Sequence, residues 1–434
     1  MPNRQNSRTS SSGNAGRGAG WSRRQVLSTA AGAGAAMLAG SQVATAQSPR
    51  PGRRVLGAND RIVLGIIGSG GMGRHHMNTL NSIGGIEWAA VCDVYEPNLN
   101  EGLKLAGSKA KAYLEHERLL ENKDIDAVVI ASPEHWHHRH LIDTVAAGKD
   151  AYSEKPMCWN IKQGQEMVEA VRKTDCIVQI GMQRRSTPII RDEIKPIFDQ
   201  GENGPLGKVH LVRAEWYWNI GIDRSSTLPG KLDWERFCGP AGKQEFAPIK
   251  FRHWRLFWPF SGGNETDQGT HLMDVVQWMM GVDQPKSAVQ WGDVFEHKPT
   301  ETPDTFCCTF EYPNFVATWT LGYSTNTWRN GWSITFQGTK GALFLTEAGY
   351  RIFDQVNGWE KGWPKPKVEV LPGSVTDTRP HLTNFLDCVR SRKQPNAPVE
   401  IGHKAVRPLH LANAALKANR RAILEDDGVT IRFA

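Results

Sequence analysis

The segment that most constrains this chain is a short apolar run, residues 62–67, followed by glycines spaced as Gly68-x-Gly70-x-x-Gly73. The run predicts a β-strand, and the residues after Gly73 continue as a helix. Gly68 permits a tight turn, Gly70 lets the backbone approach a pyrophosphate, and Gly73 lets the helix pack closely. Because the helix N-terminus directs its amides at the phosphates, this unit predicts a dinucleotide site. We expect the whole turn to contact the cofactor: Gly68, Gly70, Gly71, Met72 and Gly73.

A second predicted strand, residues 87–92, ends at Asp93, where a dinucleotide fold carries its acidic residue. A carboxylate there can accept hydrogen bonds from both hydroxyls of the adenosine ribose, and it would repel a 2′-phosphate. The sequence therefore favours NAD over NADP as the cofactor.

The N-terminus resembles a twin-arginine export signal. Arg23 and Arg24 precede an Ala- and Gly-rich apolar stretch that ends in Ala44-Thr45-Ala46, a sequence typical of a cleavage site. We expect residues 1–46 to be a signal peptide and residues 47–59 a linker. This signal predicts a periplasmic or secreted protein that folds before export and has no membrane anchor in its mature form.

Charge and cysteine content exclude several classes of protein. The first 46 residues hold five arginines and no acidic residue, so most of the net charge of +7 lies in the predicted signal. The remaining chain has no basic patch to suggest nucleic acid and no apolar run long enough to span a bilayer. The seven cysteines show neither a C-x-x-C pair nor zinc-site spacing, so we expect no metal site.

Two domains follow the linker. In residues 60–183, β-branched runs alternate with helical patterns, which predicts an α/β fold with a parallel, doubly wound sheet, a Rossmann dinucleotide-binding domain. In residues 184–434 the runs are longer and alternating, which predicts an α/β domain with one largely antiparallel sheet. There we expect residues 333–345 to form one strand and residues 402–423 the last helix.

A lysine is predicted at the edge of the first sheet. Glu154-Lys155-Pro156 follows a short strand, and proline stops that strand at its carboxyl end. Open α/β sheets bind ligands at this edge. Beside a bound nicotinamide, Lys155 can hydrogen-bond a substrate hydroxyl and stabilise the alkoxide that develops as hydride leaves.

A predicted helix over residues 267–280 presents a second set of polar residues. Asp267, His271 and Asp274 are spaced i, i+4 and i+7, so they share one helix face. A histidine beside a carboxylate is suited to take a hydroxyl proton near neutral pH. Two alternatives remain: an Asp267 favoured only by the helix dipole with His271 paired to Asp274, or a metal site, for which no companion pattern exists.

From about residue 59 onward, the chain resembles members of the glucose-fructose oxidoreductase and inositol dehydrogenase (Gfo/Idh/MocA) family. The matching segments are residues 65–73, 91–95, 131–137, 154–156 and 181–185, and Asp267-x-x-x-His271. The resemblance implies a Rossmann domain followed by an α/β domain whose open sheet often makes dimer or tetramer contacts. It also implies Lys155 as the active-site lysine, His271 as acid/base and Asp267 as its helper. The residues it places along the cofactor are Ser132, Pro133, His137, Glu154 and Lys155.

Aromatic residues fit a sugar or polyol substrate. Among sixteen tryptophans, Trp216 and Trp218 share one face of a predicted strand, and Trp254 lies in an Arg-rich aromatic stretch just before residue 267. Indole faces stack on the C–H faces of sugars, although most tryptophans are buried for packing alone. The candidate substrate contacts are Arg185, Trp218, Trp254 and Asp274.

Three functional hypotheses result. The first is an oxidoreductase that transfers hydride from a carbohydrate or polyol hydroxyl to a tightly held NAD, since an exported enzyme would find little free cofactor. The second is a redox-neutral, NAD-dependent glycoside hydrolase or lyase, in which oxidation, elimination and reduction follow one another. The third is a sugar-binding protein without catalysis, which is disfavoured because Lys155, Asp267 and His271 are all present.

Overall fold

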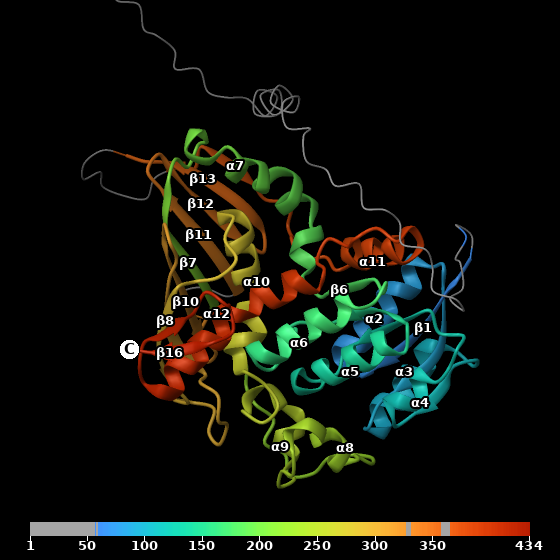
Figure 1. The fold of residues 1–434 in the computed structure, drawn as a ribbon. Helices are drawn as coiled ribbons and strands as arrows, with labels where there is room; N and C mark the ends of the chain where they lie inside the picture. The colour runs from blue at the N-terminus through green and yellow to red at the C-terminus, as the bar shows by residue number, and fades with distance from the viewer. Residues whose placement is uncertain (1–56, 58–59, 327–330, 357–364) are drawn as a thin grey trace, which may run out of the picture. The chain divides into compact units, whose positions relative to one another are not determined.

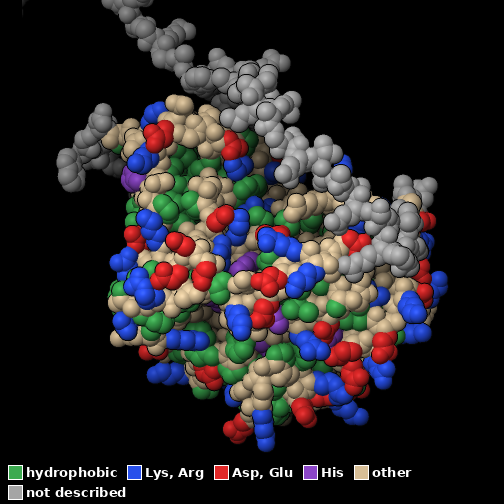
Figure 2. All heavy atoms as spheres, in the orientation of Figure 1, with side chains coloured by type: hydrophobic (Ala, Val, Ile, Leu, Met, Phe, Trp, Pro, Cys, Tyr) green, Lys and Arg blue, Asp and Glu red, His purple; other side chains and the backbone are tan. Residues whose placement is uncertain are grey.

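The computed structural model describes residues 57, 60–326, 331–356 and 365–434. The predicted signal peptide and, apart from Gly57, the predicted linker lie outside the described residues. Among the helices that are described, none is both long and apolar enough to cross a bilayer. On the face shown in Figure 2, positive and negative side chains are interspersed, and neither sign forms a continuous patch.

The first sheet is parallel and has six strands in the order β3-β2-β1-β4-β5-β6 (Figure 1). The order reverses between β1 and β4, which is where open α/β sheets bind ligands, beyond the carboxyl ends of the strands. The strands are β1 (Ile62–Ile67), β2 (Ile86–Cys92), β3 (Lys111–Tyr113), β4 (Ala127–Ile130), β5 (Asp150–Ser153) and β6 (Val178–Ile180).

Helices connect these strands and cover the two faces of the sheet. They are α2 (Gly71–Ile83), α3 (Glu96–Ala106), α4 (His116–Leu120), α5 (Glu134–Ala146) and α6 (Ile161–Arg172). β4 is buried at every position, as expected for a strand with helices on both sides. The predicted doubly wound fold is confirmed.

The second sheet has ten strands in the order β14-β13-β12-β11-β7-β10-β9-β8-β15-β16. Only β7 and β10 pair in parallel, so the predicted, mostly antiparallel sheet is confirmed. The strands are β7 (Val209–Tyr217), β8 (Ser287–Asp293), β9 (Thr305–Glu311), β10 (Val316–Gly322), β11 (Gly331–Gly338), β12 (Gly341–Thr346), β13 (Gly349–Asp354), β14 (Val368–Val370), β15 (Ala422–Leu424) and β16 (Ile431–Phe433).

Two predicted elements of this domain are wrong. The strand expected over residues 333–345 is a hairpin, because the chain turns back between Gly338 and Gly341. A Cβ at Gly338 would lie 2.1 Å from the carbonyl oxygen of Leu206, so the tight turn excludes a side chain there. The last helix ends at Ala418 rather than at residue 423, and the chain then forms β15 against β8.

Two long helices, α10 (Gly263–Met280) and α12 (Val399–Ala418), pack side by side on one face of the large sheet (Figure 1). A Cβ at Gly269 would lie 2.7 Å from Leu409 of α12 and 2.9 Å from the indole nitrogen of Trp319 in β10. Glycine at this position therefore lets α10 lie close to both neighbours. This packing fixes the helix that carries Asp267 and His271.

The C-terminal part of the chain also completes the core of the first domain. Helix α11 (Arg379–Ser391) buries Leu382, Phe385 and Leu386 beside α2 and against the nucleotide-domain core. After α11, Arg392 donates two hydrogen bonds to Asp150 at the start of β5. The two domains therefore share packing along their length.

Residues 219–262 form a long connection between β7 and α10, which we call the strap. It contains α8 (Trp234–Cys238) and α9 (Pro248–Arg252), drawn at the bottom of Figure 1. The strap has its own apolar cluster of Ile222, Phe237, Cys238, Leu256, Phe257 and Phe260, against which Val94 of the nucleotide domain packs. The remaining short elements are the turns of 3-10 or π helix at residues 183–186, 189–194, 201–203, 239–241 and 254–256, and α7 (Lys195–Asp199).

Candidate active site

The glycine turn has the shape that a dinucleotide requires. Gly68 has φ of 88°, and a Cβ there would lie 2.7 Å from the backbone of Ser132. A Cβ at Gly73 would lie 2.1 Å from the carbonyl oxygen of Gly68, so α2 could not pack this closely with any other residue. By contrast, a Cβ at Gly71 would meet no atom within 4 Å, because this position faces open space. The turn therefore leaves room for a pyrophosphate at the N-terminus of α2.

Asp93 lies at the end of β2, beside this turn. Its carboxylate accepts hydrogen bonds from the amides of Ser69, at 2.8 Å, and Tyr95, at 2.9 Å. Burial raises the pKa of Asp93, while these hydrogen bonds act in the opposite direction. The side chain is thus held rigidly where it can accept the ribose hydroxyls of a bound nucleotide.

A cavity of about 930 Å³ extends from this turn to Lys155. Its walls include nine of the residues predicted to bind the cofactor, namely Gly68, Gly70, Gly71, Met72, Asp93, Ser132, Pro133, Glu154 and Lys155. Gly73 and His137 are not part of the walls. The cavity and its hydrogen-bonding groups fit a dinucleotide that extends from the glycine turn and Asp93 to a reactive end at Lys155.

His137 lies behind the cavity wall and is fully buried. Its two ring nitrogens each lie 2.7 Å from a carbonyl oxygen, one of Ser132 and one of Pro156. His137 thus joins the segment after β4 to the segment after β5. In this structure it supports the walls of the site, and its contact with a cofactor stays a prediction.

The strap supplies the opposite wall, which the sequence did not predict apart from Trp254. The strap residues that line the cavity are Arg236, Phe237, Phe251, Arg252, Trp254 and Arg255. Backbone hydrogen bonds hold the strap to the segment just after Asp93: Asp233 donates to Val94 at 3.0 Å, and Glu96 donates to Lys231 at 2.9 Å. The Trp136 indole also donates to the carbonyl of Phe237 at 2.9 Å. The cavity is therefore bounded on this side by a segment fastened beside the predicted ribose site.

Lys155 and Asp267 form a buried ion pair between the two domains. The Lys155 ammonium lies 2.8 Å from a carboxylate oxygen of Asp267 and also donates to its carbonyl at 3.0 Å. The other carboxylate oxygen accepts a hydrogen bond from the side-chain amide of Gln268. Arg255 lies 3.2 Å from the same oxygen that contacts Lys155. Burial raises the pKa of Asp267, but the two cations lower it by more. The pKa therefore lies well below its usual range, and this carboxylate keeps its charge. Asp267, which was predicted as the helper of His271, thus pairs with Lys155 in this structure.

His271 lies one turn further along α10 and is partly exposed. Its ring centre is 6.4 Å from that of Trp216 in β7. Burial and the positive charges of Lys155 and Arg184 hold its pKa well below the usual range. The imidazole is therefore neutral at pH 7 and available as a proton acceptor.

Arg184 is a site residue that the sequence prediction missed. It is 4 % exposed, and its guanidinium lies 3.9 Å from the ring centre of Trp332. Burial lowers its pKa to about 9. The sequence contained a signal for Arg184, because it directly precedes the predicted Arg185 in the matching segment 181–185. Only the fold shows that, of these two arginines, Arg184 is the one whose charge lowers the pKa of His271.

The four residues predicted to contact the substrate have different surroundings in the structure. Arg185 forms a buried ion pair with Asp274, 2.8 Å long, so Asp274 does not pair with His271 as one alternative required. Trp218 packs edge-on against Trp216. Trp254 lines the cavity beneath the guanidinium of Arg255. Contact of these side chains with a substrate stays a prediction.

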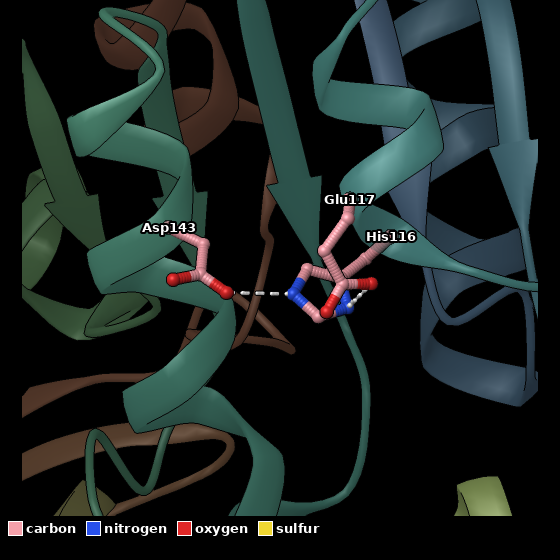
Figure 3. Close-up of side chains that lie close together, drawn as sticks. All are labelled: His116, Glu117 and Asp143. Carbon is pink, nitrogen blue, oxygen red and sulfur yellow. Dashed lines mark hydrogen bonds and ion pairs between the residues drawn. The ribbon is translucent and has the colours of Figure 1, made fainter.

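His116, Glu117 and Asp143 lie close enough together to be considered as a metal site (Figure 3). His116 Nε2 lies 2.8 Å from Asp143, and Nδ1 lies 3.1 Å from Glu117. Because the carboxylates lie at opposite nitrogens of one imidazole, a single ion cannot bind that ring and both carboxylates together. We interpret the group as a hydrogen-bonded support at the edge of the cavity, beside Trp136.

Comparison with known proteins places this chain in the Gfo/Idh/MocA oxidoreductase family. Residues 62–182 match the family's NAD-binding Rossmann fold, and residues 202–422 match its C-terminal α/β domain. The resemblance inferred from the motifs is therefore confirmed, and NAD is the cofactor that the family's first domain binds.

Among relatives, a myo-inositol 2-dehydrogenase of Thermotoga maritima is 31 % identical over 176 residues, which cover 41 % of this chain and 49 % of that protein. A glycosyl hydrolase family 109 protein of a Shewanella species is 27 % identical over 184 residues, 39 % of this chain and 40 % of that protein. The match thus spans about half the length of these relatives or less.

Solved structures show the same fold over most of the chain. The WlbA dehydrogenase of Bordetella pertussis, in complex with NADH and UDP-GlcNAcA, has a TM-score of 0.62 and 19 % identity, covering 84 % of this chain and 99 % of that one. A levoglucosan dehydrogenase in complex with NADH and levoglucosan has a TM-score of 0.66 and 14 % identity, covering 83 % and 99 %.

Substitution of Asp93 tests the assignment of the ribose site. We expect Asp93→Ala to weaken NAD binding by roughly 10- to 100-fold, since charge-assisted hydrogen bonds contribute about 1.5–3 kcal/mol. Calorimetric titration of nucleotide-free protein with NAD and with NADP measures the change. Unchanged NAD affinity, or wild-type protein that prefers NADP, would contradict the role of Asp93.

Proposed function

We propose that this chain is an NAD-dependent oxidoreductase that removes hydride from a hydroxyl-bearing carbon of a sugar or polyol. The observation that carries the proposal is the buried ion pair between Lys155, in the wall of the cofactor cavity, and Asp267, which lies one helical turn before the neutral imidazole of His271. The names of the relatives support the substrate class, because they include an inositol dehydrogenase and dehydrogenases bound to levoglucosan and a UDP-sugar.

The roles of the side chains follow from their charges. Lys155 donates a hydrogen bond to the substrate oxygen and stabilises its negative charge, while Asp267 holds the ammonium in place. Neutral His271 accepts the hydroxyl proton. Bound NAD supplies the hydride acceptor. Such proton transfer typically contributes 10²- to 10⁴-fold to the rate.

The fastening of the strap supports a cofactor that stays bound between turnovers. We infer that the strap, which is joined to residues 94–96 by backbone hydrogen bonds, separates from them when the adenosine end leaves. With retained NAD, either a second substrate takes the hydride or the same substrate receives it back. The redox-neutral glycoside hydrolase therefore remains the second candidate, and the similarity to a glycosyl hydrolase family 109 protein favours it.

Substitution of the proton-transfer pair tests the catalytic proposal. We expect Lys155→Ala and His271→Ala to slow turnover by roughly 100-fold or more while NAD stays bound, because acid/base assistance is lost and the cavity is kept. Lys162→Ala, at an exposed lysine of α6, is the matched control. Turnover of both variants at the control rate, with sugar binding unaltered, would refute the proposal.

The same assay in deuterium oxide separates the two candidate reactions. Lasting reduction of bound NAD by a free sugar, reversed only by a second carbonyl compound, identifies the oxidoreductase. Release of the aryl group from an aryl glycoside, with solvent deuterium beside the oxidised carbon and without net NADH, identifies the glycoside hydrolase instead.

Loosening the strap should speed the loss of cofactor. Tyr95 donates a hydrogen bond to the carbonyl of Pro229, and Arg236 forms an ion pair with Glu115 across the same boundary. We expect the double variant Tyr95→Phe, Arg236→Ala to release NAD about 10-fold faster, because two contacts worth about 0.5–1.5 kcal/mol each are lost. Release is followed by fluorescence after dilution, with Arg432→Ala, at an exposed ion pair of β16, as the control. Equal release rates would show that the strap does not retain NAD.

We infer that the twin-arginine segment exports the folded protein to the periplasm or beyond. Export of folded protein suits a retained cofactor, since NAD can then be loaded in the cytoplasm. We expect Arg23→Lys combined with Arg24→Lys to leave folded enzyme in the cytoplasm. Cell fractionation measures this, and undiminished export of the double variant would refute the signal.

We also infer that the chain forms a homo-oligomer through the large sheet. Helices α10 and α12 cover one face of the sheet (Figure 1), whereas 65 % of Trp291 in β8 and 41 % of Val316 in β10 are exposed. Large apolar side chains exposed on a flat sheet are typical of subunit contacts. Light scattering of the native protein tests this inference, and a monomeric mass would refute it.

A further inference from the structure

A second carboxyl group is buried where the nucleotide domain meets the catalytic helix. Glu134 is the first residue of α5 and is 0 % exposed. It directly follows Ser132 and Pro133, which form part of the cofactor cavity. The proposed proton transfer does not use this residue.

Three donors, two from the end of the strap and one from the first turn of α10, converge on the Glu134 carboxyl. The Ser261 hydroxyl donates at 2.7 Å and the Gly262 amide at 3.1 Å, both to Oε2. The Thr266 hydroxyl lies 3.2 Å from Oε2 and 3.3 Å from Oε1. Thr266 is adjacent to Asp267, so these hydrogen bonds act on the turn of helix that carries the ion pair with Lys155.

The first turns of α10 are thus attached at two points. Glu134 follows β4 and Lys155 follows β5, and these strands are neighbours in the parallel sheet, with Ile130 beside Ser153. The packing against α12 and β10 holds the body of α10. The two attachments add fixed points at its first turn, directly before His271, so they constrain how this turn meets the nucleotide domain.

The charge states of the two buried carboxyls differ. Asp267 has Lys155 and Arg255 beside it, whereas no Lys or Arg among the described residues lies within ion-pair distance of Glu134. The charged group that faces Glu134 is Asp267, and burial keeps the nearby Cys158 thiol neutral by raising its pKa. Burial raises the pKa of Glu134 to about 8, although its three donors act in the opposite direction. At neutral pH Glu134 is therefore mostly protonated, whereas Asp267 is ionised.

We propose that Glu134 is a positioning residue that couples the cavity-lining residues Ser132 and Pro133 to the catalytic helix through its hydrogen bonds to residues 261–266. This inference rests on the proposed function, because the rate of hydride transfer reports the position of α10. Ionisation of Glu134 places a second negative charge beside Asp267 without a cation to balance it. The protonated form is thus the one that holds the helix in its active position.

The kinetic test compares Glu134→Gln, which keeps a neutral group of the same shape, with Glu134→Ala, which removes the attachment. Reduction of bound NAD by myo-inositol and by levoglucosan is followed in a single turnover from pH 6 to pH 10. We expect the wild-type rate to fall above about pH 8 and the Gln variant to keep its rate to at least one pH unit higher. The Ala variant should be 10-fold or more slower at every pH with full NAD content.

Glu169→Gln, at an exposed carboxylate of α6, is the control and should follow the wild type. Identical pH profiles for the wild type and Glu134→Gln, or wild-type rates for Glu134→Ala, would overturn the inference.

A second measurement does not depend on the substrate. Because the pKa of Glu134 is raised in the folded protein above its ordinary 4.5, the folded state holds a proton that the unfolded state has lost. The melting temperature of the wild type, relative to Glu134→Gln, should therefore fall as the pH rises from 5 to 8. If neither polyol reduces NAD but this fall is present, the proposed function fails while the charge state of Glu134 stands. A constant difference would overturn the inference.

Discussion

The ion pair between Lys155 and Asp267 is the interaction on which the rest of the site depends. Both side chains are more than nine-tenths buried, so each charge has lost most of its hydration. Such a pair adds little net stability, but removal of one partner leaves an uncompensated charge and typically costs about 3–5 kcal/mol. The main-chain carbonyl of Asp267 and the amide of Gln268 complete the hydrogen bonding. The pair therefore determines where α10 meets the nucleotide domain more than it determines how stable the protein is.

The positive charge kept at this point decides what His271 can do. Burial first, and then the positive charges of Lys155 and Arg184, favour the neutral imidazole, which is why the pKa of His271 is low. A neutral ring can accept a proton from a substrate hydroxyl, whereas a charged ring could only donate one. The same cations favour an alkoxide over a hydroxyl at that place. In the proposed reaction, the same cations thus favour both the neutral His271 that takes the proton and the alkoxide that results.

The sequence predicted the parts of the fold that depend on local geometry, and it missed those that depend on contacts between distant segments. Gly68 and Gly73 could be assigned because a tight turn beside a helix excludes every larger residue. Lys155 could be placed because proline ends the strand. The strap could not be predicted, since no local pattern shows that Asp233 will donate a hydrogen bond to Val94. The pairing of Arg185 with Asp274 likewise depends on the packing of α10.

The two buried carboxyls of the interface have different charge states because their neighbours differ. Asp267 and Glu134 lie on either side of the same helical turn, and burial opposes ionisation of both. Two cations reach Asp267, whereas only neutral hydroxyls and an amide reach Glu134. Neutral dipoles stabilise a carboxylate less than an ammonium or guanidinium does, so the proton settles on Glu134. Ionised Glu134 or protonated Asp267 would each be less stable than the observed pair of charge states. The interface therefore has one preferred arrangement, in which ionised Asp267 binds Lys155.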